Sequence, residues 1–561
     1  MTDGIGPQAG EARVRGADTP PLLEETIPAL LLRCAAARPE AEAAIFTDRG
    51  LRLSWREFSQ AVDRLATGLL KLGVTRGDRV GIWAPNRPEW LLTQFATARI
   101  GAILVNVNPA YRRSELEYAL RYVGVRALIL ADRFKSSDYL AILNDLLPEL
   151  AQATPGALSA QTLPDLRIVI RMGAETSPGM LNFNDVAAIP ADTARLDAAT
   201  AALSPTDPIN IQFTSGTTGF PKGATLTHRN IVNNARFVTD RMCFTDADRL
   251  CIPVPFYHCF GMVMGVLGCV TKGAAMILPG EGFSPEATLA AVSAERCTAL
   301  YGVPTMFSAM LASDAFAASD LSSLRTGIMA GAPCPIEVMK RVRSDMNMSE
   351  VTIAYGMTET SPVSFQSFVD DPVEKRVTTV GRIHPHLEVK LVDHEGRTVA
   401  PNEIGELCTR GYSVMRGYWG DPQKTAEAID AEGWMHTGDL AVIDDEGYCS
   451  IAGRVKDMVI RGGENIYPRE IEEFLYRHPK VREVQVIGVP DGFYGEELCA
   501  CIIPMDDTLT EDEIRGFCRG QIAHYKVPRY IELMENFPMT VTGKIRKFAL
   551  RDEIAKKLGL S

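Results

Sequence analysis

The chain has 561 residues, of which 46% are hydrophobic and 23% are charged, and its formal net charge is −12. This length exceeds what one hydrophobic core usually serves, so we expect two or more domains, and the composition excludes a disordered or fibrous protein. The acidic balance argues against a general nucleic-acid-binding protein, because contacts with phosphates need a basic surface.

The cysteines and the N-terminal segment bear on location. The twelve cysteines are scattered without a C-x-x-C pair, which favours reduced thiols and a cytoplasmic protein. The first 20 residues are rich in Gly, Pro and charge, so we expect a loose segment without the apolar core of a signal peptide. No run of about 18 apolar residues occurs, and no membrane-spanning segment is expected.

Helical and strand-like stretches alternate in the first part of the chain. Helical spacing covers residues 26–40, 55–74, 90–101 and 114–124, and short runs rich in Val, Ile and Leu cover residues 42–47, 78–85, 102–109 and 126–131. The same alternation continues through residues 298–313 and 324–333. This pattern predicts an α/β fold in which helices cover parallel sheets.

The pattern of expected helices and strands changes after residue 387. Short alternating strands at 387–399, 404–411 and 447–454 predict a small antiparallel β subdomain. Helix-like stretches at 469–479 and 511–522 and strand-like stretches at 481–490 and 497–504 then predict a small α+β domain. We therefore expect a large N-terminal domain over 1–454 and a small C-terminal domain over 455–561.

The stretch TSGTTGFPKG, residues 214 to 223, has the composition of a phosphate-binding loop. Its glycines allow close approach of the backbone, and its hydroxyl groups and Lys222 can contact phosphate oxygens. It is not a P-loop of the Walker type, because Pro221 precedes the lysine and Gly223 follows it. A Gly/Ser/Thr surface turn remains an alternative for this segment alone.

Four later stretches accompany this loop in order: YGMTETSP (355–362), GWMHTGDLA (433–441), GRVKDMVIRGGENIYPREIE (453–472) and PMTVTGKIRK (538–547). Together the five stretches resemble the acyl-adenylate-forming superfamily, which contains acyl-CoA synthetases, peptide-synthetase adenylation domains and luciferases. The resemblance covers essentially the whole chain. GATLTHRNIVNN (223–234) and GGENIYPREIE (462–472) are most similar to medium-chain fatty-acyl-CoA synthetases.

This resemblance implies an ATP-dependent acid–CoA ligase that converts a fatty acid, of medium chain length, to acyl-CoA through acyl-AMP. The partners it implies are a small carboxylic acid, ATP, Mg²⁺ and coenzyme A, with no nucleic acid; a homodimer stays open. An alternative is activation of a branched, thioether or aryl-alkanoic acid, or loading of a carrier protein in trans. Only 17 residues follow Lys544, too few for a fused carrier domain.

The resemblance also implies roles for individual residues. Four are expected to be catalytic: Lys544, Thr358, Glu359 and His258. Mg²⁺ is assigned to Glu359 and Thr217, in keeping with its preference for oxygen ligands. The residues expected to bind ATP are Thr214, Ser215, Gly216, Thr217, Thr218, Gly219, Lys222, Gly331, Ala332, Pro333, Tyr355, Gly356, Asp439 and Arg454.

The remaining implied roles concern motion and the acyl group. Lys456 corresponds to the hinge of a mobile C-terminal domain, and Gly462 and Gly463 to the coenzyme A channel. Acetate-activating relatives carry a Trp at the place of Gly356, so a glycine there is expected to lengthen the pocket. The expected acyl-pocket residues are Phe256, Gly261, Met262, Val303, Pro304 and Gly356.

Structural alternatives remain for these residues. Outside the family context, Tyr355 reads as a core aromatic residue, Asp439 as a turn or helix-cap residue, and Glu359 and Lys544 as surface charges. A buried histidine without a catalytic role remains open for His258, and a purely backbone requirement for Gly356. The two histidines of GRIHPH (381–386) do not indicate a metal site, because no third ligand follows at a recognisable spacing.

Overall fold

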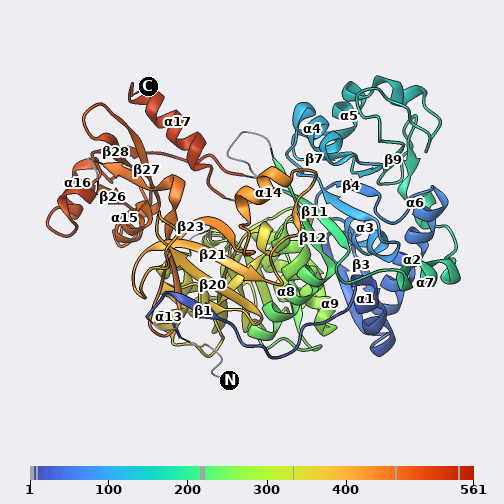
Figure 1. Cartoon of the computed structure of the whole chain (residues 1–561), viewed down its shortest axis with the longest axis horizontal. Helices are drawn as coiled ribbons and strands as arrows, with labels where there is room; N and C mark the ends of the chain where they lie inside the picture. Colours follow the sequence, from blue (N-terminus) through green and yellow to red (C-terminus); the bar gives the residue numbers. More distant parts are fainter. Residues whose placement is uncertain are drawn as a thin grey trace.

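The computed structural model describes residues 6–7, 10–214, 221–332, 334–461, 464–540 and 544–560. Figure 1 shows a large domain, coloured from blue to light orange, and a small domain in orange and red at one end. The expected α/β class, with a large N-terminal and a small C-terminal domain, is confirmed.

One sheet of the large domain has eight strands, six of them parallel. At one edge, β12 runs antiparallel to β11, which directly precedes it in the chain, and β22 runs antiparallel to β12. The phosphate-loop sequence therefore connects two neighbouring strands. In spatial order the strands are β10 (Leu181–Asn182), β9 (Ile168–Arg171), β6 (Ala127–Leu130), β4 (Arg79–Trp83), β5 (Ile103–Asn106), β11 (Pro208–Thr214), β12 (Lys222–Thr227) and β22 (Gly417–Tyr418).

The second sheet of the large domain has nine strands, and its six central strands are parallel. Antiparallel strands close both edges. In spatial order the strands are β19 (Arg382–Ile383), β18 (Val363–Gln366), β17 (Glu350–Gly356), β16 (Thr326–Ala330), β15 (Ala299–Gly302), β13 (Arg249–Cys251), β14 (Ala275–Leu278), β2 (Glu42–Phe46) and β3 (Leu51–Ser54).

The predicted antiparallel subdomain is a five-stranded sheet. The expectation of a loose N-terminal segment is wrong in part, because residues 13–15 form its edge strand and pair with Leu387–Val392. The short segment is stabilised by a strand far away in the sequence, whose side chains are alternately buried. A local sequence pattern could not reveal this pairing. The strand order is β1 (Arg13–Arg15), β20 (Leu387–Val392), β21 (Gly405–Gly411), β23 (Met435–Ile443) and β24 (Cys449–Arg454).

The small domain is built on a fourth sheet with a core on each face. Along the segment ELCACIIP, Leu498, Ala500 and Ile502 face one core, and Cys499, Cys501 and Ile503 face the other. Successive side chains of a strand point to opposite faces, so a continuous apolar run fits a sheet covered on both sides. The strands are β25 (Val459–Arg461), β26 (Glu464–Ile466), β27 (Val481–Asp491), β28 (Gly495–Pro504) and β29 (Tyr530–Leu533).

Helices cover the sheets, and α2 illustrates how their sequences fit. Ser54 and Glu57 cap its first turn by reciprocal hydrogen bonds of 3.2 and 2.8 Å, and Phe58, Val62 and Leu65 lie on its buried face. The α-helices are α1 (Ile27–Ala37), α2 (Trp55–Lys71), α3 (Pro88–Arg99), α4 (Arg113–Val123), α5 (Tyr139–Leu146), α6 (Phe183–Ala187), α7 (Thr193–Ala201), α8 (His228–Arg241), α9 (Gly268–Lys272), α10 (Pro285–Ala294), α11 (Pro304–Leu311), α12 (Ile336–Asp345), α13 (Val373–Thr378), α14 (Pro422–Ala428), α15 (Pro468–Leu475), α16 (Glu511–Cys518) and α17 (Lys547–Lys557).

Shorter elements complete the fold. A two-stranded ribbon joins β7 (Arg133–Phe134) and β8 (Ser137–Asp138). A π-helical segment, η3 (Phe260–Leu267), precedes α9. The 3₁₀ turns are η1 (Thr47–Arg49), η2 (Pro148–Gln152), η4 (Phe316–Ala318), η5 (Thr358–Thr360), η6 (Val455–Asp457) and η7 (His524–Lys526).

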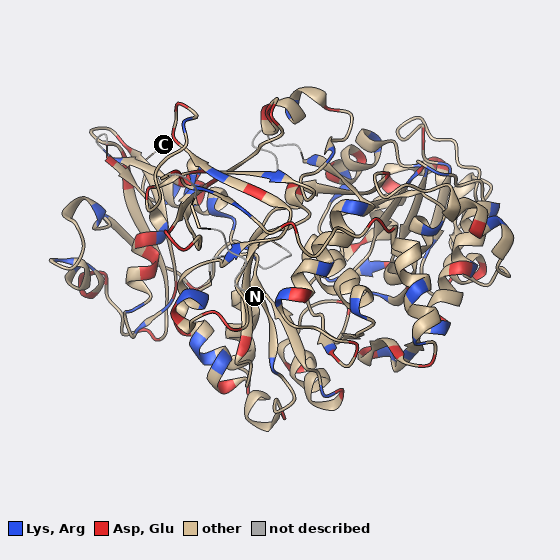
Figure 2. Cartoon of the chain, turned by 60° about the horizontal axis from the view of Figure 1, so that its bottom comes forward, with Lys and Arg blue, Asp and Glu red and all other residues tan. Residues whose placement is uncertain are grey.

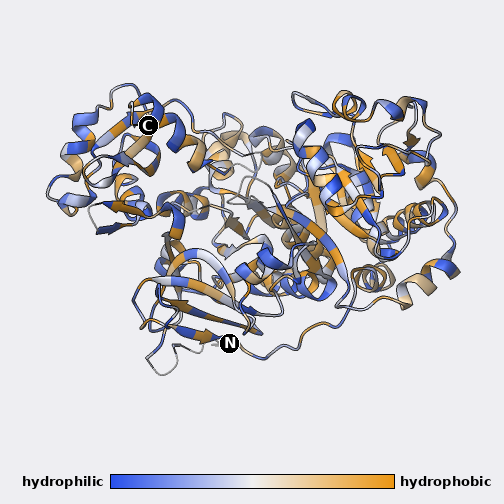
Figure 3. Ribbon diagram, turned by 45° about the horizontal axis from the view of Figure 1, so that its top comes forward, coloured by the Kyte–Doolittle hydropathy of each residue, from blue (hydrophilic) through white to orange (hydrophobic). Residues whose placement is uncertain are grey.

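The surface carries charges of both signs. In Figure 2, Lys and Arg are interspersed with Asp and Glu over the helices of the large domain. Figure 3 shows hydrophobic residues concentrated in the strands, with hydrophilic residues on the surrounding helices. Among the described residues, no helix has the length and apolar character needed to cross a bilayer.

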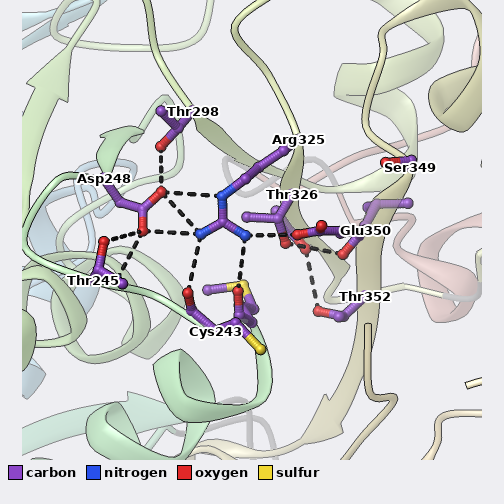
Figure 4. A network of polar contacts seen from close by, with 12 residues as sticks. Cys243, Thr245, Asp248, Thr298, Arg325, Thr326, Ser349, Glu350 and Thr352 are labelled. Carbon is purple, nitrogen blue, oxygen red and sulfur yellow. Dashed lines mark hydrogen bonds and ion pairs between the residues drawn. The ribbon is translucent and has the colours of Figure 1, made fainter. Parts of the chain in front are cut away.

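An arginine joins the N-terminal ends of four neighbouring strands of the nine-stranded sheet (Figure 4). Arg325, directly before β16, donates to both carboxylate oxygens of Asp248 at 2.9 Å and to Glu350 at 2.6 Å. Thr298, directly before β15, donates to the same aspartate at 2.7 Å. This network holds the strand ends opposite the edge where the candidate active site lies.

Candidate active site

The candidate site lies at the carboxyl edge of the nine-stranded sheet. The parallel strands β15, β16 and β17 end at Gly302, Ala330 and Gly356. Carboxyl ends of adjacent parallel strands meet at one edge, and ligands of open α/β sheets bind there. The residues that follow β15 and β16 and those that end β17 are therefore brought together: Val303, Pro304, Gly331, Ala332, Tyr355 and Gly356.

Tyr355, Asp439 and Arg454 form one hydrogen-bonded group. The Tyr355 hydroxyl donates to Asp439 Oδ2 at 2.5 Å, and Arg454 Nε donates to Asp439 Oδ1 at 3.0 Å. Asp439 and Arg454 are directly opposite on β23 and β24. The aspartate is thus fixed from two sides, by residues of two different sheets.

Burial and neighbouring charges fix the protonation states of Tyr355 and Arg454. Burial and the adjacent Asp439 carboxylate raise the pKa of Tyr355 well above its ordinary value, so its hydroxyl stays protonated. Burial lowers the pKa of Arg454, but the negative charges of Asp439 and Asp457 outweigh this effect and raise it. Arg454 therefore stays charged.

Glu359 is a buried carboxylate beside Thr214, the last residue of β11. Thr214 and Tyr418 both donate to its Oε1, at 2.9 and 3.0 Å. Lys222 lies with its Nζ 4.8 Å from the centre of the Tyr418 ring. Within the described part of the chain, no Lys, Arg or His forms an ion pair with Glu359, and a buried carboxylate in that setting fits a Mg²⁺ ligand.

Lys544 reaches the site from the small domain. Its Cε lies 3.6 Å from the place that a Cβ on Gly331 would occupy, and its charge acts on His258. Burial and the positive charge of Arg454 lower its pKa, while Asp439 and Glu359 oppose the shift. A cation of the C-terminal segment therefore shares one site with the two carboxylates of the large domain.

His258 is neutral in this structure. Burial and the nearby charge of Lys544 lower its pKa to about 3. Its Nδ1 accepts a hydrogen bond from the backbone N–H of Phe260 at 3.2 Å. The ring therefore keeps its proton on Nε2 and offers a donor rather than a positive charge.

Five of the six residues expected to form the acyl pocket are buried, and the sixth, Gly356, is exposed. Phe256 is held by a 2.8 Å hydrogen bond from its N–H to Asn86, and Met262 lies on the π-helical segment η3. A cavity of about 300 Å³ lies directly beside them, between the large domain and the 539–540 segment of the small domain. Its lining includes Pro255, Tyr257, Thr305, Met306, Met539 and Thr540.

The inference from small residues to a longer pocket needs correction. A Cβ on Gly356 would lie 1.7 Å from the carbonyl oxygen of Pro362, and one on Gly261 would lie 2.3 Å from that of Pro255. Close backbone packing therefore requires glycine at both positions. The absence of a side chain at Gly356 has a backbone cause and says nothing by itself about acyl chain length.

Other expected residues are placed as follows. Thr358 begins η5, next to Glu359, and Lys456 is the middle residue of η6 between the two domains. The remaining expected site residues lie outside the described residues: Ser215, Gly216, Thr217, Thr218, Gly219, Pro333, Gly462 and Gly463. In the segment GRIHPH, the ring of His384 bonds to Gln366, and that of His386 bonds to the carbonyl of Pro20.

The sequence analysis missed several polar residues that support the site. Tyr418 bonds Glu359, and Gln212 accepts a hydrogen bond from Cys259 at 3.2 Å. Asn106 donates to the carbonyl of Tyr257 at 2.9 Å. Asn106 and Gln212 interrupt apolar strands, and an amide in a buried strand is the signal that could have identified them.

Comparisons with known proteins identify the family. The family model described as AMP-binding enzyme matches residues 31–419, and the model for the AMP-binding enzyme C-terminal domain matches residues 470–544. YngI of Bacillus subtilis (strain 168), which carries the provisional name acyl-CoA synthetase, is 49% identical over 544 residues, covering 96% of this chain and 99% of its own. The human mitochondrial medium-chain acyl-CoA ligase ACSF2 is 46% identical over 563 residues, covering 99% and 91%.

A solved structure shares the whole architecture. The anthranilate CoA ligase AuaEII, in complex with anthranoyl-AMP, superposes with a TM-score of 0.84 at 28% identity and covers 97% of this chain and 99% of its own.

Proposed function

The chain belongs to the AMP-binding enzyme family, and we propose that it is an ATP-dependent acid–CoA ligase that forms acyl-CoA through acyl-AMP. The observation that carries this proposal is the position of Lys544 beside Gly331, together with Asp439, Arg454 and Glu359. Two cations and two carboxylates on different elements thus lie together, as a reaction between ATP and a carboxylic acid needs.

In the first step, a carboxylate oxygen of the acid attacks the α-phosphorus of ATP, and the bond to pyrophosphate breaks. Asp439 and Tyr355 hold the ribose and the adenine, respectively, and Lys222 and Thr358 contact phosphate oxygens. Lys544 stabilises the negative charge shared by the attacking carboxylate and the phosphate. Such fixed charges in a site shielded from water give the main rate enhancement in this kind of chemistry.

Mg²⁺ would be held by Glu359, with Thr217 of the phosphate loop, and when bound it would neutralise phosphate charge. In the second step, the thiol sulfur of coenzyme A attacks the acyl carbon, its proton passes to solvent, and AMP leaves. His258, being neutral, orients the acyl carbonyl as a hydrogen-bond donor and supplies no positive charge.

The proposed acid is a medium-chain fatty acid. The buried apolar residues Phe256, Met262 and Val303 suit an alkyl tail, and each CH₂ that leaves water contributes about 0.8 kcal/mol. ACSF2, named as a medium-chain ligase, supports this choice. Branched, thioether or aryl-alkanoic acids are the alternative, and a carrier protein could replace coenzyme A. The similar anthranilate CoA ligase, which is named for an aromatic acid, is a reason to include such acids in the test.

A screen of coenzyme A-dependent AMP release across acids from C2 to C18, with aromatic acids included, tests the substrate class. We expect activity to rise with chain length up to the medium range. A preference for acetate over hexanoate would contradict the proposal.

The proposed mechanism alternates two arrangements of the small domain. Residues 455–561 would rotate at Lys456, presenting Lys544 for adenylation and the segment around Gly462 and Gly463 for thioester formation. Hinges of this kind absorb a large backbone change at few residues. The proximity of Lys544 to Gly331 supports the arrangement proposed for the first step.

Separating the half-reactions tests the role of Lys544. We expect Lys544→Ala to abolish acid-dependent ATP–pyrophosphate exchange and to spare thioester formation from supplied acyl-AMP. The control is Lys556→Ala, an exposed lysine on α17, which should leave both steps unchanged. Equal loss of both steps in Lys544→Ala would refute the assigned role.

Location and assembly complete the proposal. All twelve cysteines are free thiols, which supports a reducing compartment, and we propose the cytoplasm. For the assembly we propose a homodimer, which sedimentation equilibrium of the purified protein tests directly; a mass of one chain at all concentrations would exclude it.

A further inference from the structure

Three metal-binding side chains meet on the antiparallel sheet, outside the groups described above. Glu406 and Cys408 lie two residues apart on β21, so their side chains leave the same face of the sheet. His436 on β23 is the cross-strand partner of Cys408. One ligand atom from each of the three lies within 4.8 Å of the others.

The two separations from His436 Nδ1 match those of ligands around one ion. His436 Nδ1 lies 3.2 Å from Glu406 Oε2 and 3.5 Å from Cys408 Sγ. A tetrahedral Zn²⁺ at about 2.0 Å from nitrogen and oxygen and about 2.3 Å from sulfur sets its N and O ligands roughly 3.3 Å apart and its N and S ligands roughly 3.5 Å apart. The three side chains thus need little rearrangement to bind an ion.

The far side of the imidazole faces a carboxylate. His436 Nε2 lies 3.7 Å from Asp430 Oδ2, which is longer than a hydrogen bond. The other carboxylate oxygen of Asp430 is fixed by the backbone N–H groups of Glu432 and Trp434, each at 2.9 Å. A carboxylate in this position orients the ring so that Nδ1 points toward the site.

One side of the cluster is open to solvent. The side chains of His436 and Glu406 are 34% and 26% exposed, whereas Cys408 is buried. A water molecule can therefore complete the coordination. Thiolate and imidazole together select Zn²⁺ over Mg²⁺ or Ca²⁺, which prefer oxygen ligands.

We propose that Glu406, Cys408 and His436 form a binding site for Zn²⁺, with water as the fourth ligand and Asp430 as a positioning residue. Cys408 binds as the thiolate, and its proton passes to solvent. The ion would join β21 to β23 directly before Asp439, because Glu406 Oε1 also accepts the N–H of Gly438 at 3.1 Å. This site does not depend on the proposed function and needs no substrate.

Metal binding to the full-length, tag-free chain tests the proposal. After treatment with a chelator and dialysis, Zn²⁺ is titrated by calorimetry without ATP. We expect one equivalent to bind and the Tm to rise, because a ligand that binds only the folded state stabilises it. We expect Cys408→Ser and His436→Gln to lose this equivalent and Asp430→Asn to weaken its binding by about tenfold.

Two matched controls separate this site from general metal binding. Cys243→Ser removes an exposed cysteine elsewhere, and His394→Gln removes an exposed histidine beyond the end of β20. Both should keep the equivalent. Loss of zinc binding in a control, or its retention in Cys408→Ser, would overturn the proposal.

Cobalt substitution gives a second readout that needs no folded Cys408 variant. Co²⁺ bound to a thiolate gives a sulfur-to-cobalt absorption band in the near ultraviolet. We expect one equivalent of Co²⁺ to produce this band in the wild type and in Cys243→Ser. Absence of the band in both proteins would contradict the proposal. His436 and Glu406 would then form only an ion pair, and Cys408 would be a neighbouring thiol that binds no metal.

Discussion

The hydroxyl group of Tyr355 donates a 2.5 Å hydrogen bond to Asp439, which lies 84 positions further along the chain. Tyr355 ends a strand of the nine-stranded sheet, and Asp439 belongs to the antiparallel sheet. The bond therefore connects two sheets at the expected nucleotide site. It also gives the aspartate a second donor besides Arg454.

Replacing Tyr355 by Phe should weaken ATP binding. A hydrogen bond to a charged group contributes about 1.5 kcal/mol or more, which corresponds to roughly tenfold in affinity. We expect the KM for ATP to rise about tenfold in Tyr355→Phe, with the KM for coenzyme A unchanged, as measured by steady-state kinetics.

A matched tyrosine outside the site provides the control. Tyr448 donates to Asp371 at 2.7 Å in a similar tyrosine–aspartate pair. Tyr448→Phe should lower the Tm to a similar extent without changing the KM for ATP. A rise in the KM for ATP in both variants would point to general destabilisation instead.

The lowered pKa of Lys544 predicts how adenylation depends on pH. Its ammonium group is present below its pKa in the folded protein and is lost as the pH rises through that value, which lies below the ordinary 10.5. Pyrophosphate exchange should therefore fall at alkaline pH. In Lys544→Arg, the residual pyrophosphate exchange should fall only at a higher pH, because a guanidinium group stays charged. An alkaline limb at the same pH in both proteins would contradict the assignment.

Proline at position 456 should separate the two steps. Lys456 lies in a 3₁₀ turn, whose φ near −60° a proline can adopt, so the present arrangement should persist. We expect near-normal pyrophosphate exchange and greatly reduced thioester formation in Lys456→Pro, measured separately. Unimpaired thioester formation would mean that the hinge lies elsewhere.

Alanine at position 356 should impair the enzyme with all acids alike. Its Cβ would collide with the backbone of Pro362, so the strand end must shift whatever acid is bound. We expect kcat/KM to fall by similar factors for acetate, hexanoate and octanoate, with a lowered Tm. Gly492→Ala, where a Cβ meets no atom within 4 Å, should have no effect. Selective loss of octanoate activity would restore a direct pocket role.

Removing the arginine of Figure 4 should affect stability and spare catalysis. Arg325→Met leaves the carboxylate of Asp248, only 5% exposed, without its cation, and breaking such a pair costs about 3 kcal/mol. Urea unfolding should show this loss, while kcat/KM at 25 °C stays unchanged because the strand ends concerned lie opposite the site. Arg296→Met, which removes an exposed pair with Asp320, should cost much less, because solvent screens such a pair. Equal costs would contradict the prediction.

Much of the fold could be predicted from the sequence. Alternation of helical and strand periodicity depends on neighbouring residues, so α1, α2 and β4 fall within the predicted stretches. Strand β1 was not predicted, because its three residues show no periodicity of their own and form a strand by pairing with Leu387–Val392. The family resemblance, rather than periodicity, pointed to Asp439 and Lys544.

The sequence by itself determined the α/β class, the order of the motifs and the kinds of side chain available for catalysis, because these are encoded in short stretches. Only the tertiary structure decided which groups meet. It brings Tyr418 to Glu359 and places a neutral His258 near Lys544. It also forms the cluster of Glu406, Cys408 and His436. Burial, hydrogen-bond partners and charge states depend on distances through space between residues far apart in the chain. The requirement for glycine at 356 has the same origin, since the atom that excludes a side chain belongs to Pro362 on the adjoining strand end.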